Sequence, residues 1–258
     1  LKRQTQVIEH LIQTGTETII VAGTTGESPT LSKDEKLRLF EHTLEIAGGR
    51  VKVIAGTGSN NTKDSIELTR KAEELGVDGI MLVTPYYNRP NQEGLFQHFK
   101  AIAQSTALPV MLYNVPGRTG CNMEAETVCR LAEISNITMV KEASGNLSQM
   151  TEILRGTPDG FVLYSGDDSL TLPVLAIGGY GVVSVASHVL GRAMTDMINA
   201  FVHGRLDEAA KLHQQLEPQF KALFKAPSPV PVKTVMKELG VDAGPVRLPL
   251  VPLSQKER

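Results

Sequence analysis

Short runs of apolar and β-branched residues recur along the chain, separated by longer stretches in which apolar residues return every three or four positions. Runs of the first kind are typical of buried strands, and stretches of the second kind are typical of amphipathic helices. We expect seven strands, at residues 18–22, 51–55, 79–84, 110–115, 138–143, 161–165 and 181–185.

Helical stretches lie between most of these strands. We expect helices at residues 33–47, 62–75, 94–105, 124–133 and 147–154, and a further one at 6–13 before the first strand. Ser32 and Glu35 have the spacing of a capping box, and Asn61 or Thr62 could cap the helix that follows. Strands that alternate with helices predict right-handed βαβ units and a parallel sheet.

The number of strands bears on the type of α/β fold. Seven in sequence fit a doubly wound sheet or a (β/α)8 TIM barrel that lacks one strand, and the helix-like opening before the first strand favours the barrel. We therefore expect a barrel over residues 1–190, with its first strand missing from this chain. The later pattern is mostly helical, at 209–224 and 232–239, and predicts a C-terminal helical extension at 191–258 that packs on the barrel.

Composition excludes several classes of function. The 26 Lys and Arg residues are balanced by 28 Asp and Glu residues and are spread along the chain, whereas nucleic-acid binding needs a basic surface. The apolar runs are too short to span a membrane and the start has no signal-peptide core, so we expect a cytoplasmic protein. Cys121 and Cys129 have the spacing of neither a disulfide framework nor a zinc site, and we expect no metal.

Lys141 is the most informative residue because it lies near the end of an apolar, strand-like run. Alternation along a strand puts Met139, Lys141 and Ala143 on one face. If that face is a barrel interior, desolvation disfavours the ammonium form and leaves an amine that can form a Schiff base with a ketone. The ordinary alternative is a lysine that extends to water at a strand end.

The C-terminal ends of the strands are where a parallel barrel carries its chemistry. Tyr113 shares a strand face with Met111 and can point inward beside Lys141, where a phenol could shuttle protons. Arg118 lies on a glycine-flanked turn and offers a planar fork for a carboxylate, although a surface ion pair is the ordinary role of such a residue. Other candidates at these ends are Thr24, Thr25, Tyr86, Tyr87, Gly166 and Val183.

Several motifs resemble those of the dihydrodipicolinate synthase family of pyruvate-dependent class I aldolases. They are Gly-Thr-Thr-Gly-Glu at 23–27, Pro-Tyr-Tyr-Asn at 85–88, Tyr-Asn-Val-Pro-Gly-Arg-Thr-Gly at 113–120 and Val-Lys-Glu-Ala-Ser-Gly-Asn at 140–146. Ser-Gly-Asp-Asp at 165–168 and Pro-Val-Pro-Val-Lys at 229–233 match in order, so the resemblance covers nearly the whole chain.

The resemblance implies condensation of pyruvate with aspartate 4-semialdehyde, at the entry to diaminopimelate and lysine synthesis. It implies an imine on Lys141 and no cofactor, because the imine itself is the electron sink. It assigns proton transfer to Tyr113, relayed through Thr24 and through Tyr87 of a neighbouring subunit, in a homotetramer built as a dimer of dimers. Substrate binding falls to Thr25, Val183, Gly166 and Arg118.

The resemblance also raises the question of feedback inhibition, since some family members are inhibited by lysine. The positions that correspond to such an effector site are Ser28, Asn60, Asp64 and Tyr86. Lys33 and Lys36 add positive charge there, which disfavours a cationic effector. We therefore expect weak inhibition or none.

Family members have a strand before the segment that opens this chain and a helix after the point where it ends. A barrel without one strand exposes two sheet edges, so we expect the 258-residue polypeptide to fold poorly if it is made as written. Recovery of soluble, active protein would contradict this expectation.

Two other functions stay open. An N-acetylneuraminate lyase or a 2-keto-3-deoxy-sugar-acid aldolase uses the same imine chemistry, but such enzymes generally lack an arginine at the Arg118 position. A non-catalytic barrel that only binds a keto acid would need a defect at Lys141, Tyr113 or Thr24, and the sequence has none.

Overall fold

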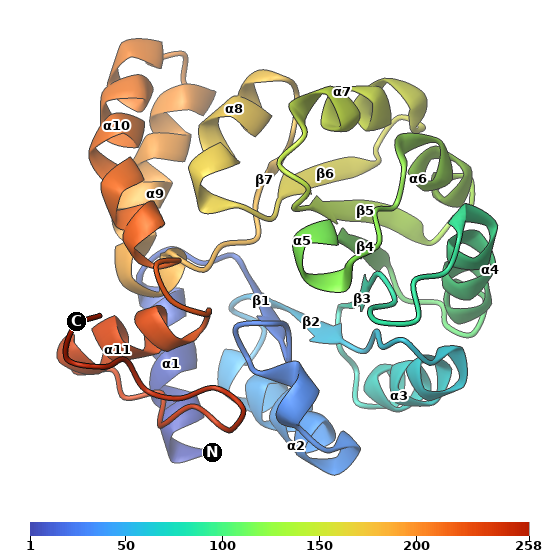
Figure 1. The fold of residues 1–258 in the computed structure, drawn as a ribbon, viewed down its shortest axis with the longest axis horizontal. Coiled ribbons are helices and arrows are strands. Elements are labelled where there is room, and N and C mark those ends of the chain that lie inside the picture. Colours follow the sequence, from blue (N-terminus) through green and yellow to red (C-terminus); the bar gives the residue numbers. More distant parts are fainter. Residues whose placement is uncertain (258) are drawn as a thin grey trace. The chain divides into compact units, whose positions relative to one another are not determined.

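The computed structural model describes residues 1–257, and within them seven strands form one sheet in chain order (Figure 1). Neighbours from β2 to β7 pair in parallel. This order and direction are those of a (β/α)8 barrel, so the predicted fold class is confirmed, whereas a doubly wound sheet would have a non-sequential order. The strands are β1 (Thr18–Val21), β2 (Lys52–Gly56), β3 (Gly79–Val83), β4 (Val110–Asn114), β5 (Ile137–Glu142), β6 (Val162–Ser165) and β7 (Gly181–Val182).

The chain divides into two compact units. The first comprises Leu1–Val53 and the chain from Ser184 onward, and the second comprises Ile54–Val183. The boundary therefore falls inside β2 and again just after β7.

The first unit is mostly helical. Helix α1 packs against α2 and α9, and α9 packs in turn against α10 and α11. Ile8 on α1, Phe40 on α2 and Phe220 on α10 are among its fully buried side chains. Its helices are α1 (Lys2–Gln13), η1 (Ser28–Thr30), α2 (Lys33–Ala47), α9 (Ser187–Val202), α10 (Leu206–Ala222) and α11 (Val230–Glu238).

The predicted capping box at the start of α2 is confirmed. The Ser32 hydroxyl accepts a hydrogen bond from the Glu35 N–H at 3.2 Å, and the Ser32 N–H donates to the Glu35 carboxylate at 2.9 Å. This reciprocal pair satisfies two of the N–H groups that a helix start leaves without partners.

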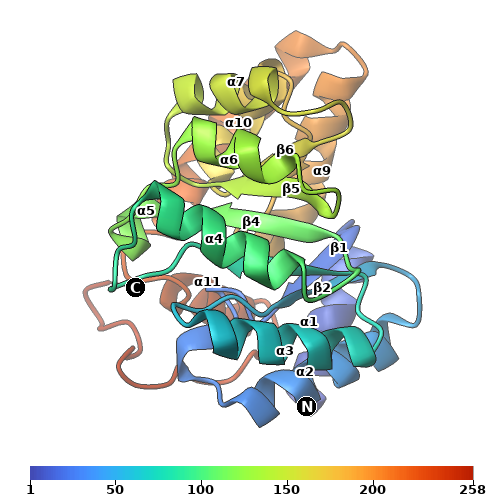
Figure 2. The same cartoon turned by 90° about the vertical axis from the view of Figure 1, so that its right-hand side faces the viewer.

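The second unit carries the longer run of strands. Helices α3, α4, α6 and α7 form one layer along its strands, each packed on the next (Figure 2). Asn61, and not Thr62, caps α3, since its side chain accepts from the N–H groups of Lys63 and Asp64. The helices are α3 (Thr62–Glu74), α4 (Gln92–Ala103), α5 (Pro116–Thr119), α6 (Ala125–Ala132), α7 (Leu147–Gly156), η2 (Asp168–Leu170) and α8 (Thr171–Ala176).

Strand β7 is the element that differs most from the sequence prediction. It ends at Val182, whereas the apolar pattern predicted a strand to residue 185. The chain then leaves the sheet, and Val183 donates one further hydrogen bond to the Ser165 carbonyl before α9 begins. No helix in the described part of the chain is long and apolar enough to cross a membrane.

Candidate active site

Lys141 and Tyr113 lie side by side at the ends of β5 and β4. The two residues are opposite each other in the parallel register, so both side chains leave the same face of the sheet. The Lys141 Nζ atom is 4.0 Å from the centre of the Tyr113 ring, and the two residues are 8% and 4% exposed. The alternative of a lysine that extends to water is therefore wrong.

Gly166 leaves space for the Lys141 side chain. It follows β6 directly, and a Cβ atom there would lie 3.2 Å from the Lys141 Cε atom and 2.6 Å from the Ala143 Cβ atom. Real Cβ atoms hardly ever come so close to another side chain, so a larger residue would displace the lysine or distort β5. The Gly166 N–H donates to the Glu142 carbonyl at 2.7 Å, which fixes this approach.

The ends of β3 and β4 are tied together. The N–H and the hydroxyl of Thr84 both donate to the Tyr113 carbonyl, at 2.9 and 3.0 Å. Beyond Thr84 the chain turns outward, and Tyr87 is 91% exposed with a positive φ of 73°. A tyrosine in this left-handed conformation carries a steric cost, and its ring extends away from its own chain.

Asn60 and Tyr86 are brought together by a hydrogen bond. The Asn60 side-chain amide donates to the Tyr86 carbonyl at 3.1 Å, and the Asn88 amide donates to the Asn60 carbonyl at 2.9 Å. Asp64 lies in the first turn of α3, just after this loop. Three of the four positions predicted for an effector site therefore belong to the second unit, and Ser28 belongs to the first.

Arg118 lies on the short helix α5, which follows β4 after Val115. Its side chain is exposed, and its N–H donates to the Val115 carbonyl at 2.9 Å. The helix ends at Gly120, which has a φ of 70°, so the backbone turns sharply beyond the arginine. Arg118 thus presents its guanidinium to solvent one turn after the strand that carries Tyr113.

Glu142 is a fully buried carboxylate next to Lys141, on the opposite face of β5. Its oxygens accept hydrogen bonds from the Ser144 N–H at 2.7 Å, from the Gln149 amide at 3.1 Å and from the Asn114 amide at 3.0 and 3.2 Å. Burial raises the pKa of Glu142, and the hydrogen bonds from Asn114 and Ser144 act in the opposite direction. The sequence prediction missed this network, although the register of Asn114 opposite Glu142 was a signal for it.

The loop at residues 23–28 belongs to the first unit and carries the predicted residues Thr24, Thr25 and Ser28, all of them partly exposed. The Glu27 N–H donates to the Thr24 carbonyl at 3.0 Å, and the Ser28 N–H donates to the Gly23 carbonyl at 3.2 Å. These bonds fold the loop back on itself directly after β1.

Val183, the remaining predicted position, follows β7 in the second unit. Its N–H donates to the Ser165 carbonyl at 2.8 Å, next to Gly166. Within residues 1–257, no three His, Cys, Asp or Glu side chains gather closely enough to hold a metal ion. Both cysteines are free thiols, and burial raises the pKa of each.

Comparison with known proteins agrees with this geometry. The model of the dihydrodipicolinate synthetase family matches residues 1–258. The 4-hydroxy-tetrahydrodipicolinate synthase of Bacillus velezensis is 61% identical over 98% of this chain and 87% of its own length. A dihydrodipicolinate synthase structure from Bacillus anthracis is 56% identical, with a TM-score of 0.98 over 99% of this chain and 88% of its own.

A further solved structure, from Cyanidioschyzon merolae, is a dihydrodipicolinate synthase with lysine bound. It is 48% identical, with a TM-score of 0.97 over 99% of this chain and 87% of its own.

The sequential parallel strands and the buried lysine at a strand end define an enzyme of the (β/α)8-barrel lyase class. Within that class, the chain belongs to the dihydrodipicolinate synthetase family.

Proposed function

We propose that this enzyme condenses pyruvate with L-aspartate 4-semialdehyde through an imine on Lys141, which is the 4-hydroxy-tetrahydrodipicolinate synthase reaction of lysine and diaminopimelate synthesis. The observation that carries the proposal is the buried Lys141 amine 4.0 Å from the Tyr113 ring, in a chain of this family. An amine that lies inside a site in this way can attack the ketone of a keto acid and form a Schiff base.

The reaction begins when the Lys141 amine attacks the ketone carbon of pyruvate and water leaves, which gives a protonated imine. Loss of a proton from the pyruvate methyl group then gives an enamine, because the imine nitrogen accepts the electron pair. The enamine carbon attacks the aldehyde carbon of the second substrate, and a proton is added to the new alkoxide. The amino group of that substrate then attacks the imine carbon and displaces the Lys141 amine, which closes the ring and releases the product. These steps need proton transfer only, and no metal or organic cofactor.

Tyr113 is the group proposed to move these protons, since its ring contacts the lysine side chain. The family pattern adds Thr24 and a Tyr87 from a second copy of the chain as a relay. The exposure and the positive φ of Tyr87 support a role outside its own chain. A relay of this kind requires at least a dimer, and we propose a homotetramer built as a dimer of dimers.

Substrate carboxylates are proposed to bind in two places. Thr25 and its loop, together with the backbone at Gly166 and Val183, hold the pyruvate carboxylate. Arg118 engages the carboxylate of the semialdehyde, because its exposed fork can form two parallel hydrogen bonds. The proposed location of the enzyme is the cytoplasm.

For regulation by lysine, a relative supports binding of the effector, whereas two charged residues of this chain oppose it. The Cyanidioschyzon merolae relative binds lysine, and Asn60 and Tyr86 are joined by a hydrogen bond in this chain. Lys33 and Lys36 follow Ser28 closely in the sequence and oppose a cationic effector, although burial lowers the pKa of Lys36. We propose weak inhibition or none, and a micromolar inhibition constant would show this to be wrong.

The experiment that tests the proposed function is treatment with pyruvate and borohydride, followed by peptide mapping and an assay with aspartate semialdehyde. The proposal requires a reduced pyruvyl adduct on Lys141 and turnover of the semialdehyde. An adduct without turnover would point to a sugar-acid aldolase, and no adduct would overturn the imine mechanism.

A further inference from the structure

Glu27 lies near the end of the loop at residues 23–28, which carries Thr24 and Thr25. Its backbone has a φ of 55°, and Ala22 at the start of the loop has a φ of 56°. Non-glycine residues resist this left-handed conformation, because Cβ crowds the following carbonyl oxygen. Gly26 lies between them, and a Cβ there would come within 3.3 Å of the Ala22 backbone. The cost of this conformation is offset by the hydrogen bonds within the loop and by contacts outside it.

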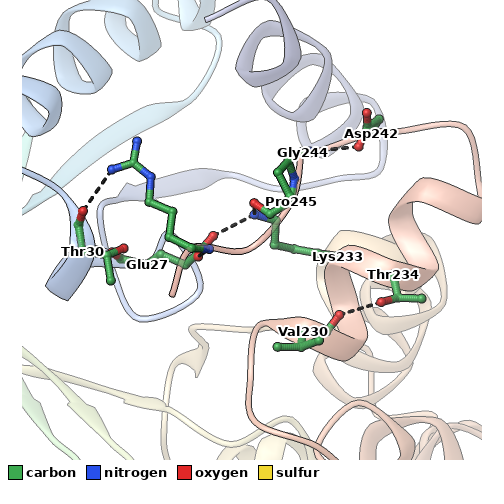
Figure 3. A network of polar contacts seen from close by, with 9 residues as sticks. Glu27, Thr30, Val230, Lys233, Thr234, Asp242, Gly244 and Pro245 are labelled. Atoms are coloured by element: carbon green, nitrogen blue, oxygen red, sulfur yellow. Dashed lines mark hydrogen bonds and ion pairs between the residues drawn. The ribbon is translucent and has the colours of Figure 1, made fainter. Parts of the chain in front are cut away.

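The Glu27 carboxylate makes those contacts with both of its oxygens. One oxygen is 2.7 Å from the Lys233 Nζ atom on α11 (Figure 3), and the other accepts a hydrogen bond from the backbone N–H of Arg247 at 2.8 Å. The Glu27 and Lys233 side chains are only 11% and 13% exposed. Lys233 also donates to the Pro245 carbonyl at 2.9 Å. The ion pair is therefore well shielded from water. The two partners of Glu27 lie 206 and 220 positions after it in the sequence.

Arg247 fixes the chain that follows the loop. Its guanidinium donates to both Glu35 oxygens, at 3.0 and 2.6 Å, and to the Thr30 carbonyl at 2.9 Å. Thr30 in turn donates through its hydroxyl to the Glu27 carbonyl at 3.0 Å. The segment 233–247 thus holds the loop at Glu27 and holds the start of α2 at Glu35.

We propose that Glu27 is a positioning residue for the pyruvate site, and that its ion pair with Lys233 fixes the loop in the conformation that presents Thr24 and Thr25. The inference rests on the proposed function, in which this loop holds the pyruvate carboxylate. The C-terminal segment at Lys233 and Arg247 then sets pyruvate affinity without touching pyruvate.

The test compares three single variants, one double variant and one control variant with the wild-type enzyme. Glu27→Gln keeps the size of the side chain and removes its charge, Lys233→Met removes the cation, and Lys233→Arg keeps it. Glu9→Gln is the control for loss of an ion pair in the same unit, because Glu9 forms a short pair with Arg50 that is more exposed and is not joined to the loop. The pyruvate concentration that gives half-maximal borohydride trapping of Lys141 is measured with the KM for each substrate, well below each variant's unfolding temperature.

We expect Glu27→Gln and Lys233→Met each to raise the KM for pyruvate and the half-trapping concentration about tenfold, with the KM for the semialdehyde unchanged. The double variant should raise the KM for pyruvate no further than either single variant does, because both substitutions remove the same interaction. Lys233→Arg and Glu9→Gln should stay within about twofold of wild type.

A purely structural ion pair would lower the unfolding temperature and leave pyruvate binding unchanged, and that result would overturn the inference. If Lys233→Met does not fold, Glu27→Gln and Lys233→Arg still decide the question, since an unchanged pyruvate KM in Glu27→Gln is sufficient to refute it. Failure of the wild-type enzyme to trap pyruvate would instead refute the proposed function.

Discussion

The ends of β4 and β5 and the loop at residues 23–28 are positioned by different interactions. Lys141 and Tyr113 sit on paired strands, and the neighbouring Glu142 is held by neutral donors, namely two amides and one N–H. The loop is held by charged groups, with Glu27 on Lys233 and Glu35 on Arg247. In the proposed function the covalent chemistry falls to the sheet, and the carboxylate contact falls to a loop whose ion pairs join residues far apart in the sequence.

This difference predicts different sensitivities. Strand pairing and buried amide contacts are little screened by salt, and the same holds for the shielded Glu27–Lys233 pair, whereas the exposed Glu35–Arg247 pair weakens as ionic strength rises. Loss of a strand-end residue should abolish chemistry or destabilise the second unit. Loss of a loop contact should change pyruvate affinity and leave the chemistry possible.

Lys141→Met should give the largest effect on activity. Methionine fills similar space but has no amine, so the imine cannot form, and we expect the rate to fall by roughly three orders of magnitude or more. The measurement is the initial rate with both substrates, together with borohydride trapping. Lys63→Met, on the exposed surface of α3, is the control and should retain full activity. Turnover close to wild type in Lys141→Met would contradict the mechanism.

Glu142→Gln should destabilise the protein while leaving Lys141 in place. The new amide would face the Asn114 and Gln149 donors, and we expect a loss of about 2 kcal/mol in the free energy of unfolding at pH 7. Urea denaturation measures it. Glu126→Gln, on α6, is the control.

The pH dependence of this loss sharpens the test. Burial raises the pKa of Glu142, so the folded state binds its proton more tightly than the unfolded state. The contribution of this carboxyl to stability is then fully present below pH 4.5 and declines as the pH rises through the folded-state pKa. The gap between wild type and Glu142→Gln should therefore narrow as the pH rises above 4.5, and a gap that widens would show the assignment to be wrong.

Much of the fold could be predicted from local patterns. All seven strands and the helix at Lys33–Ala47 follow from apolar periodicity and from the Ser32 capping box, which are properties of neighbouring residues. Helix α9 was not predicted as an element, because its start has no side-chain cap and it contains Gly191. A Cβ at Gly191 would come within 2.9 Å of Thr14, so tertiary packing explains this glycine.

In the site, too, some features could be predicted from local patterns and others could not. Alternation along adjacent strands was sufficient to predict that Tyr113 lies beside Lys141, because their register follows from the sheet. The pairs of Glu27 with Lys233 and of Glu35 with Arg247 could not be predicted from spacing, since their partners are more than two hundred positions away. The catalytic roles of all these residues stay predictions until they are tested.

His98 offers a test of stability that is confined to the second unit. Its Nδ1 atom is 2.8 Å from the Thr62 hydroxyl, its Nε2 atom is buried without a partner, and desolvation lowers its pKa from 6.5 to about 4. The unfolded state binds the His98 proton more tightly than the folded state does. The contribution of His98 to the free energy of unfolding is therefore full above pH 6.5 and is lost as the pH falls through about 4. We expect a loss on the order of 3 kcal/mol over that range.

Urea denaturation at pH 6.5 and pH 4 measures the His98 contribution. His98→Gln should flatten the decline in stability between the two pH values, whereas His203→Gln, at an exposed position, should leave it unchanged. An equal decline in wild type and His98→Gln would assign the acid sensitivity to other groups.

Arg247→Ala should give the smallest effect and should separate the two regions most clearly. Hydrogen bonds from the Arg247 side chain and the Ser32 N–H lower the pKa of Glu35 from 4.5 to about 2. The contribution of the Glu35 carboxylate to stability is therefore full above pH 4.5 and is lost as the pH falls through about 2. The pair is exposed, so we expect the KM for pyruvate to rise by no more than about threefold in the variant.

Salt should raise the wild-type KM for pyruvate slightly and should have less effect on Arg247→Ala. Arg130→Ala, which breaks an exposed pair with Glu93 in the second unit, is the control and should respond to salt as wild type does. A carbon NMR titration should show the Glu35 pKa rising towards 4.5 in Arg247→Ala. Equal salt responses in Arg247→Ala and wild type would mean that the exposed Glu35–Arg247 pair does not help to hold the loop.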